Sequence, residues 1–336
     1  MSPSSTIRTG SGAQHAAIQG IGGYRPSRVV TNEEVCRLID SSDEWIRTRS
    51  GIIERKWAEP HETVQMMSVA SSRKALSRAG IDPAQIDCVI VATVSHLLQT
   101  PAVATLISEE LGCTPAAAFD ISAACAGFCH GVALASDMVR SGSAKYILAI
   151  GVERLSDITD PTDRGTAFIF ADGAGAAVIG PSETEGIGPV VWGADGSKFD
   201  LIRQNETWTD VLDMDKPEMP TLRMDGNPVF RWASFEMAKI AGEALDRAGL
   251  TIDDLDVFVP HQANMRIVDA MARALKLPER VVIARDIAYQ GNTSAASIPL
   301  ATEALLESGE AKTGDVALFI AFGAGLAYAA QVVTLP

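Results

Sequence analysis

The sequence is poor in cysteine and in basic residues, and each shortage excludes a class of protein. Five cysteines in 336 residues, with no Cys-x-x-Cys pair, do not form a disulfide framework and suit a reducing compartment. The 28 Lys and Arg residues are outnumbered by 42 Asp and Glu residues, which leaves a formal net charge of −14. General nucleic-acid binding needs a basic surplus, so we expect no nucleic-acid partner. Any anionic ligand must meet a local basic patch.

The sequence also lacks a clear targeting segment or membrane span. The first residues, MSPSSTIRTGSGAQH, are small and polar with no apolar stretch, so we expect a mobile tail over 1–14, no signal peptide and a cytoplasmic location. The most apolar run, Ala317 to Val333, is shorter than the roughly 20 residues of a membrane helix and contains Gly323 and Gly325. We predict two buried strands joined by a glycine turn there, and no membrane association.

A metal site is not expected either. Cys125 and Cys129 are four residues apart, and His130 follows directly. A zinc site would need a further cluster of ligands at matching spacing, and none is visible. These cysteines are therefore packed hydrophobic residues or, at one position, a nucleophile.

What the sequence does contain is an internal repeat. KALSRAGIDPAQIDCVIV (74–91) resembles EALDRAGLTIDDLDVFVP (243–260), and SGSAK (141–145) resembles SGEAK (308–312). Each copy of the longer segment has the pattern of a helix that ends at a glycine, a short polar loop and a buried strand. Helices that alternate with apolar strands predict an α/β protein with covered sheets. We infer two similar halves, 15–185 and 186–336.

Three polar residues follow predicted strands, where ligands gather in such sheets. Cys125 lies between a strand at 116–122 and a helix whose N-terminus would favour a thiolate; the alternative is a packed cysteine. His261 follows the strand 257–260 and precedes a helix that ends at Leu275, although a histidine at such a position is more often structural than catalytic. Asn292 lies in a glycine turn. Together they form the pattern of covalent catalysis.

The other histidines are less well placed. His96 follows the strand 89–94 and is the rival candidate to His261. His15 and His61 lie in polar segments, and His130 lies within a helix.

These residues and their surroundings resemble the thiolase superfamily, and within it the β-ketoacyl-acyl-carrier-protein synthase III family. The resemblance covers nearly the whole chain after the tail. It is carried by SSDEWIRTRSGI (41–52), AACAGF (123–128), PTDRGT (161–166), DGAGAAV (172–178), VPHQANMRI (259–267) and GNTSAAS (291–297). It implies duplicated α/β halves in a layered αβαβα core. The segments CAGFCH and MDGNPVFRWA look most like starter-unit synthases of actinobacterial aromatic polyketide pathways, with a housekeeping fatty-acid synthase III close behind.

The resemblance implies a role for each matching residue. Cys125 is the acylated nucleophile, His261 and Asn292 the decarboxylation pair, and the backbone N–H groups of Cys125 and Ala324 the oxyanion hole. The coenzyme A positions are Trp45, Arg49, Arg164, Gly226, Phe230 and Asn264, and Arg266 meets the carrier protein. Arg273 and Lys276 would extend a basic patch around Arg266.

Two departures from the family pattern matter. Ala324 stands in Phe322-Gly-Ala-Gly325, where many members have a third glycine; the amide survives, but the methyl group restricts the backbone. Thr100 stands where many members place a bulky Phe or Met that reaches the acyl pocket of the partner subunit. A smaller Thr100 should open that pocket.

The implied reaction is a ping-pong decarboxylative condensation of a starter acyl-CoA with malonyl-acyl carrier protein, without a cofactor, in a homodimer. Three alternatives stay open. A relative of the same fold transfers the acyl group to an alcohol or amine without decarboxylation, although the intact Asn292 argues against it. A cysteine hydrolase would need a base positioned for water. A non-catalytic paralogue would usually lack Cys125.

Overall fold

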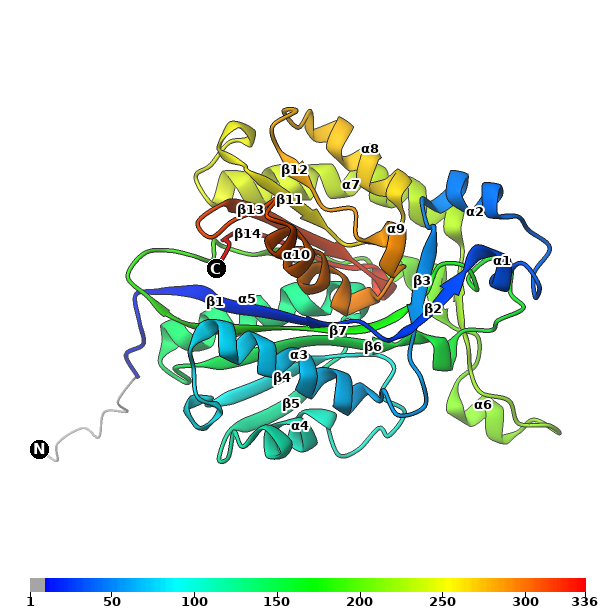
Figure 1. Ribbon diagram of the computed structural model, residues 1–336, viewed down its shortest axis with the longest axis horizontal. Coiled ribbons are helices and arrows are strands. Elements are labelled where there is room, and N and C mark those ends of the chain that lie inside the picture. Colours follow the sequence, from blue (N-terminus) through cyan, green and yellow to red (C-terminus); the bar gives the residue numbers. More distant parts are fainter. Residues whose placement is uncertain (1–9) are drawn as a thin grey trace, which may run out of the picture.

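Two five-stranded sheets form the core of the computed structural model, which describes residues 10–336 (Figure 1). The first sheet has the order β1 (His15–Tyr24), β7 (Asp172–Ser182), β6 (Ile147–Arg154), β4 (Cys88–Ala92) and β5 (Ala117–Ile121). The second has the order β8 (Val191–Ala194), β14 (Ala327–Thr334), β13 (Val316–Phe322), β11 (Val257–Pro260) and β12 (Val282–Ile283).

The two sheets repeat one topology. In each sheet, three neighbouring strands are parallel: β6, β4 and β5 in the first, and β13, β11 and β12 in the second. The other two strands of each sheet continue from β6 or β13 by antiparallel pairing, as β7 and then β1, and as β14 and then β8. The duplicated α/β fold is therefore confirmed. The expected boundary between residues 185 and 186 falls in the connection from β7 to β8, and it stays a prediction.

Helices fill the three layers around these sheets. Between the sheets lie α5 (Gly127–Ser141) and α10 (Ser297–Ser308), which pack with apolar side chains from both sheets. The outer face of the first sheet carries α3 (Val64–Ala79) and α4 (Val103–Leu111); that of the second carries α7 (Gly226–Arg247) and α8 (Met265–Leu275). Small residues cover several faces of α5, as a helix buried between two sheets requires. The result is the expected αβαβα arrangement (Figure 1).

The sequence repeat corresponds to equivalent pieces of the two halves. The first copy covers the end of α3 and then β4, and the second covers the end of α7 and then β11. Gly80 and Gly249 end the two helices with φ of 65° and 70°, a left-handed conformation that costs a glycine little. The repeat in the sequence thus reports an equivalent chain path.

Shorter elements cover one end of the layers, on the right of Figure 1. They enclose a separate apolar cluster that includes Ile46, Leu155 and Phe168. The short elements of the chain are β2 (Arg28–Thr31), α1 (Asn32–Val35), α2 (Asp43–Ser50), β3 (Glu54–Trp57), β9 (Ile202–Gln204), α6 (Trp208–Leu212), β10 (Leu222–Met224) and α9 (Ile287–Gln290).

The most apolar run of the sequence forms β13 and β14, which pair antiparallel as predicted. No helix within residues 10–336 is both long and apolar enough to cross a bilayer. Part of the expected tail, residues 1–9, lies outside the described residues. The remainder is attached to the fold, since the Ala13 N–H donates to the Val139 carbonyl near the end of α5 at 3.2 Å.

Candidate active site

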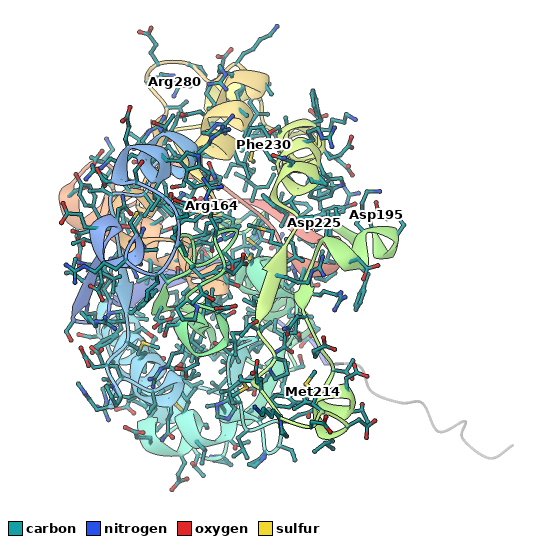
Figure 2. All side chains as sticks on the ribbon, turned by 90° about the vertical axis from the view of Figure 1, so that its right-hand side faces the viewer. Arg164, Asp195, Met214, Asp225, Phe230 and Arg280 are labelled. Carbon is teal, nitrogen blue, oxygen red and sulfur yellow. The ribbon has the colours of Figure 1, made fainter. Side chains whose placement is uncertain are left out.

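Cys125, His261 and Asn292 line one cavity of about 490 Å³. Cys125 follows β5 and precedes α5, His261 follows β11, and Asn292 precedes α10. The three residues therefore reach the cavity from strand ends and loops of both halves, as the duplicated topology requires. Arg164 and Phe230 also line this cavity, and both are labelled in Figure 2 on the side of the molecule that faces the viewer.

The turn that carries Cys125 is tight. Ala124 has φ of 45°, a left-handed conformation that is unfavourable for a residue with a side chain. Gly323, at the end of β13, lies so close that a Cβ atom there would be 2.6 Å from the Cys125 nitrogen. Neither the Cys125 N–H nor the Ala324 N–H donates to a backbone carbonyl of the loops and turns within residues 10–336. Two backbone donors next to a nucleophile suit a developing oxyanion.

Two opposing effects act on the charge of Cys125. Burial raises the pKa of the thiol to about 12. The N-terminus of α5 favours the anion. The thiolate expected from the sequence stays a prediction.

His261 is a neutral hydrogen-bond donor. It is buried, and burial lowers the pKa of its imidazole to about 3. Its Nδ1 lies 2.7 Å from the Ser297 Oγ, which accepts the Gln262 N–H at 3.4 Å. In the tautomer that donates into the cavity, Nδ1 accepts the Ser297 hydroxyl proton and the ring proton is on Nε2. The edge of the ring faces Phe322, with ring centres 5.8 Å apart.

Asn292 is held so that its NH₂ group is the free part of the amide. Its Oδ1 accepts the Ser294 N–H at 2.8 Å, and its own backbone bonds to Ile169 and Ala171 on both sides. A buried amide whose oxygen is already bonded presents two N–H donors. Together with the His261 Nε2–H, it offers uncharged donors to an oxygen anion.

Arginine and aromatic side chains surround the outer part of the cavity. The Arg49 and Arg164 guanidinium carbons lie 5.9 and 4.7 Å from the centre of the Trp45 ring, and the Arg266 guanidinium carbon lies 5.0 Å from that of Phe230. No carboxylate pairs with any of the three arginines within residues 10–336, and the three line the cavity. A chain with a net negative charge needs such a local positive patch to bind an anionic ligand.

Two further residues expected to bind coenzyme A, Gly226 and Asn264, also line the cavity. Gly226 begins α7, and a Cβ atom there would meet nothing within 4 Å, so this side is open. Asn264 lines the cavity, but its Oδ1 caps α8 through the Arg266 N–H and its Nδ2 donates to the Arg49 carbonyl. Asn264 therefore joins α8 to α2 as well as facing the cavity.

Two expected site residues lie elsewhere in the single chain. Ala324 does not line the 490 Å³ cavity; it borders a second one of about 470 Å³, together with Ala123, Ala124 and Trp192. Thr100 is exposed and lines neither cavity. Its expected place in the acyl pocket of a partner subunit stays a prediction.

The other histidines are not part of the cavity. His96, the rival to His261, is absent from its lining, and the ring of His130 stacks on Trp192 with centres 5.5 Å apart. Within residues 10–336, no group of three or more His, Cys, Asp or Glu side chains is placed to hold a metal ion.

Sequence reasoning missed the apolar lining and the polar residues behind the cavity. Phe168 packs edge-on against Trp45 with ring centres 5.3 Å apart, and Phe322 faces His261. Nothing in a single sequence separates such aromatic residues from ordinary core residues. Ser294 and Ser297 lie inside a segment already singled out, GNTSAAS, and their hydroxyls at the start of a buried helix were the available signal.

Comparison with known proteins places this arrangement in a family. Residues 119–196 match the model of "3-Oxoacyl-[acyl-carrier-protein (ACP)] synthase III", and residues 245–335 match that of its C-terminal part. The chain is 59% identical over 332 residues to a β-ketoacyl-[acyl-carrier-protein] synthase III of Streptomyces glaucescens, which covers 99% of this chain and 100% of that relative. A mycobacterial β-ketoacyl-[acyl-carrier-protein] synthase III of Mycobacterium avium is 51% identical and covers 98% of both.

Solved structures agree. The priming β-ketosynthase of the R1128 polyketide biosynthetic pathway superposes with a TM-score of 0.96 at 48% identity and covers 99% of both chains. The 3-oxoacyl-[acyl-carrier-protein] synthase III of Aquifex aeolicus gives 0.88 at 36% identity and covers 95% of this chain and all of that one.

Proposed function

Because the chain belongs to the 3-oxoacyl-[acyl-carrier-protein] synthase III family, we propose that Cys125, His261 and Asn292 perform its condensation. The chain is an acyltransferase of the β-ketoacyl-[acyl-carrier-protein] synthase III type. The observation that carries the residue assignment is that a half-buried thiol and two uncharged donors, from opposite halves of the chain, line one cavity.

In the first half-reaction, the Cys125 sulfur attacks the thioester of a starter acyl-CoA. The backbone N–H groups of Cys125 and Ala324 bind the oxyanion, and each such donor contributes roughly 3 kcal/mol to the transition state. Coenzyme A then leaves, and the acyl group stays on the sulfur. The small side chains of Ala123 and Ala124 leave room beside the sulfur for that group.

In the second half-reaction, malonyl-acyl carrier protein enters the same cavity. Loss of CO₂ leaves an enolate whose negative oxygen accepts hydrogen bonds from the His261 Nε2–H and the Asn292 NH₂. Neutral donors suit this step because a carboxylate at either position would repel both malonate and enolate. The carbanion attacks the acyl-Cys125 thioester and forms the β-ketoacyl product.

The charge at the outer end of the cavity supports the choice of substrates. Arg49, Arg164 and Trp45 offer cationic and aromatic groups to the nucleotide end of coenzyme A. Arg266 contacts the carrier protein in this proposal, and Arg273 in α8 and Lys276 at its C-cap add charge without a carboxylate partner within residues 10–336. We further propose a homodimer in the cytoplasm and no resident cofactor.

The rival reactions differ in the group that accepts the acyl chain from Cys125. A transferase to alcohols or amines would need no enolate site, yet Asn292 is held with its NH₂ group free. The similarity to the priming β-ketosynthase of the R1128 pathway favours a starter-unit role, and the similarity to the Streptomyces relative favours a general synthase III. Competition between starters of different length separates these two roles.

The test follows intact protein mass and CO₂ in two stages. Incubation with acyl-CoA alone should add one acyl group at Cys125, and later addition of malonyl-acyl carrier protein should release CO₂ and restore the free thiol. In Asn292→Asp, self-acylation should persist while CO₂ release falls by about 100-fold, because an anion replaces a donor. Acyl transfer to an alcohol without CO₂ would support the rival transferase, and normal condensation by Asn292→Asp would remove that residue from the mechanism.

A further inference from the structure

Arg25 directly follows β1, in the first half of the chain, and its guanidinium group bonds to two separate places in the second half. Its Nη2 donates to the two carboxylate oxygens of Asp286, at 3.1 and 3.3 Å, and to the Leu300 carbonyl at 2.8 Å. Its Nη1 donates to Glu303 Oε2 at 2.9 Å. One planar guanidinium therefore joins the residue before α9 to two residues of α10.

The segment between these two attachment points carries residues of the proposed enolate site. Asn292 lies between α9 and α10, and Ser297, whose hydroxyl bonds with the His261 Nδ1, is the first residue of α10. Leu300 and Glu303 follow Ser297 by only about 5 and 9 Å along the helix axis. Arg25 is therefore attached to this segment both before and after the residues that bind the enolate.

The attachment at Asp286 is also coupled to His261. Asp286 is the N-cap residue of α9, and the N–H of the next residue, Ile287, donates to Gln262 Oε1 at 3.1 Å. The Gln262 Nε2 donates to the Pro260 carbonyl at 2.7 Å. Gln262 directly follows His261, so the start of α9 and the strand end that carries the imidazole hold each other in place.

The attachment at Glu303 is buried and closely packed. The Glu303 side chain has no exposed surface, and its Oε1 accepts the Gly23 N–H at 2.7 Å. A Cβ atom on Gly23 would collide with Glu303 Oε2, so only a glycine at this position of β1 admits the carboxylate. A buried carboxylate needs cations and hydrogen-bond donors around it, and Arg25 supplies both to this one.

We propose that Arg25 is a positioning residue for decarboxylation, which bridges Asp286 and Glu303 and so fixes the loop between them. The inference rests on the proposed function, in which Asn292 and His261 bind the enolate oxygen. The bridge holds the Asn292 loop at both ends. Through the start of α9 and the first turn of α10, it also holds the His261 ring.

The groups proposed for acylation lie outside this bridge. Cys125 and Ala324 belong to the turns before α5 and after β13, and Arg25 makes no side-chain hydrogen bond to either turn within residues 10–336. A displacement of about 1 Å in a group that binds a transition state can cost about 100-fold in rate. Loss of the bridge should therefore slow CO₂ release and leave acylation of the sulfur near its normal rate.

Asp286→Asn and Arg25→Lys open the bridge in two different ways. Asp286→Asn removes the charged partner before α9 and leaves the bonds of Arg25 to α10 in place. Arg25→Lys keeps a positive charge beside Glu303, but one ammonium group cannot reproduce the planar fork. Both variants should lower kcat for CO₂ release about tenfold, with the KM for malonyl-acyl carrier protein changed less than about twofold. Acylation by acyl-CoA, followed by rapid quench and intact mass, should change less than about threefold.

Arg78→Gln is the matched control for stability. Arg78 donates to the same buried carboxylate, at 3.2 Å from Glu303 Oε1, and its other partners are the Ile21 carbonyl and Glu307. The substitution should lower Tm, yet both half-reactions should stay within about threefold of the wild type, because the bridge to Asp286 is intact. An equal loss of CO₂ release in Arg78→Gln would show that stability sets the rate, and would overturn the positioning role.

A double-mutant cycle tests whether Arg25 acts through Asn292. In the Asn292→Asp background, Arg25→Lys should slow CO₂ release by less than about threefold more, because the group that it positions is already lost. A full further tenfold loss in that background, or equal losses of acylation and CO₂ release in Arg25→Lys alone, would overturn the positioning role. Absence of any adduct on wild-type Cys125, or normal condensation by Asn292→Asp, would instead overturn the proposed function on which the bridge depends.

Discussion

Ser297 lies between a backbone amide and the His261 ring, and this position gives it control over the ring proton. Its oxygen accepts the Gln262 N–H, and in the tautomer that donates into the cavity its own proton bonds to Nδ1 of His261. Without that hydroxyl, the neutral imidazole can place its proton on either nitrogen. Only the Nε2–H form donates into the cavity.

Ser297→Ala should therefore slow decarboxylation about tenfold, the equivalent of one lost hydrogen bond of about 1–1.5 kcal/mol, while self-acylation stays near the wild-type rate. CO₂ release and intact mass measure the two half-reactions. Thr302→Val is the control, because Thr302 is a buried hydroxyl of the same helix that bonds only to the Ile298 carbonyl. Equal effects of Ser297→Ala on both half-reactions would contradict the assignment.

At the residue scale, the sequence predicted which polar residues lie at strand ends, but it did not predict which of their side chains carry protons. Cys125, His261 and Asn292 each follow a predicted strand or a glycine turn, and all three line one cavity. The thiolate stays a prediction, because burial favours the thiol and the helix N-terminus favours the anion. The buried hydrogen bond from Ser294 to Glu153 was not foreseen, because it joins residues 141 positions apart and depends on the approach of the two halves.

At the scale of elements, repeated sequence predicted repeated structure. The helix, loop and strand of each repeat, the strand 257–260 and the two strands within 317–333 are confirmed. The short helices and strands between residues 195 and 225 could not be predicted from the repeat. They have no counterpart in the repeat, and pieces as short as β9 and β10 take their form from neighbours more than from local preference.

One element depends on a cap supplied by another. The N-cap residue of α4, Ala102, has no side-chain acceptor, and Asp120 of β5 accepts the Val103 and Ala104 N–H groups at 2.8 and 3.0 Å instead. This carboxylate fixes the start of α4, and with it the segment that contains Thr100, to the edge of the first sheet.

Asp120→Ala should destabilise the protein by about 1–2 kcal/mol, because two N–H groups lose their acceptor. In thermal unfolding this corresponds to a fall in Tm of about 1.5–3 °C. Asp120→Asn keeps one acceptor oxygen and should lie between the two. A Tm for Asp120→Ala equal to that of the wild type would show that water replaces the cap without loss.

At the scale of the whole molecule, the first sheet ends in an open edge. Within residues 10–336, β5 pairs only with β4, and its Ala117 and Phe119 side chains are exposed, Phe119 by 37%. An unpaired edge with an exposed aromatic residue is a place where a second copy of a chain can pair. Dimerisation along β5 would bring Thr100, which precedes α4 at the same side of the sheet, toward the other copy. The proposed homodimer and the proposed acyl-pocket role of Thr100 therefore depend on one interface.

Two substitutions separate the interface from the pocket. Light scattering should give a dimer for the wild type and monomers for Phe119→Lys, because a charge on the open edge opposes pairing. In the dimer, Thr100→Phe should shift starter competition from medium or branched acyl-CoAs toward acetyl-CoA, since the larger side chain fills space in the partner subunit. In the Phe119→Lys background the same substitution should have no effect on starter choice, because Thr100 is exposed in the single chain and contacts no cavity of its own. Unchanged starter preference in dimeric Thr100→Phe would remove Thr100 from the acyl pocket, and a shift that persists in monomers would place its action within one chain.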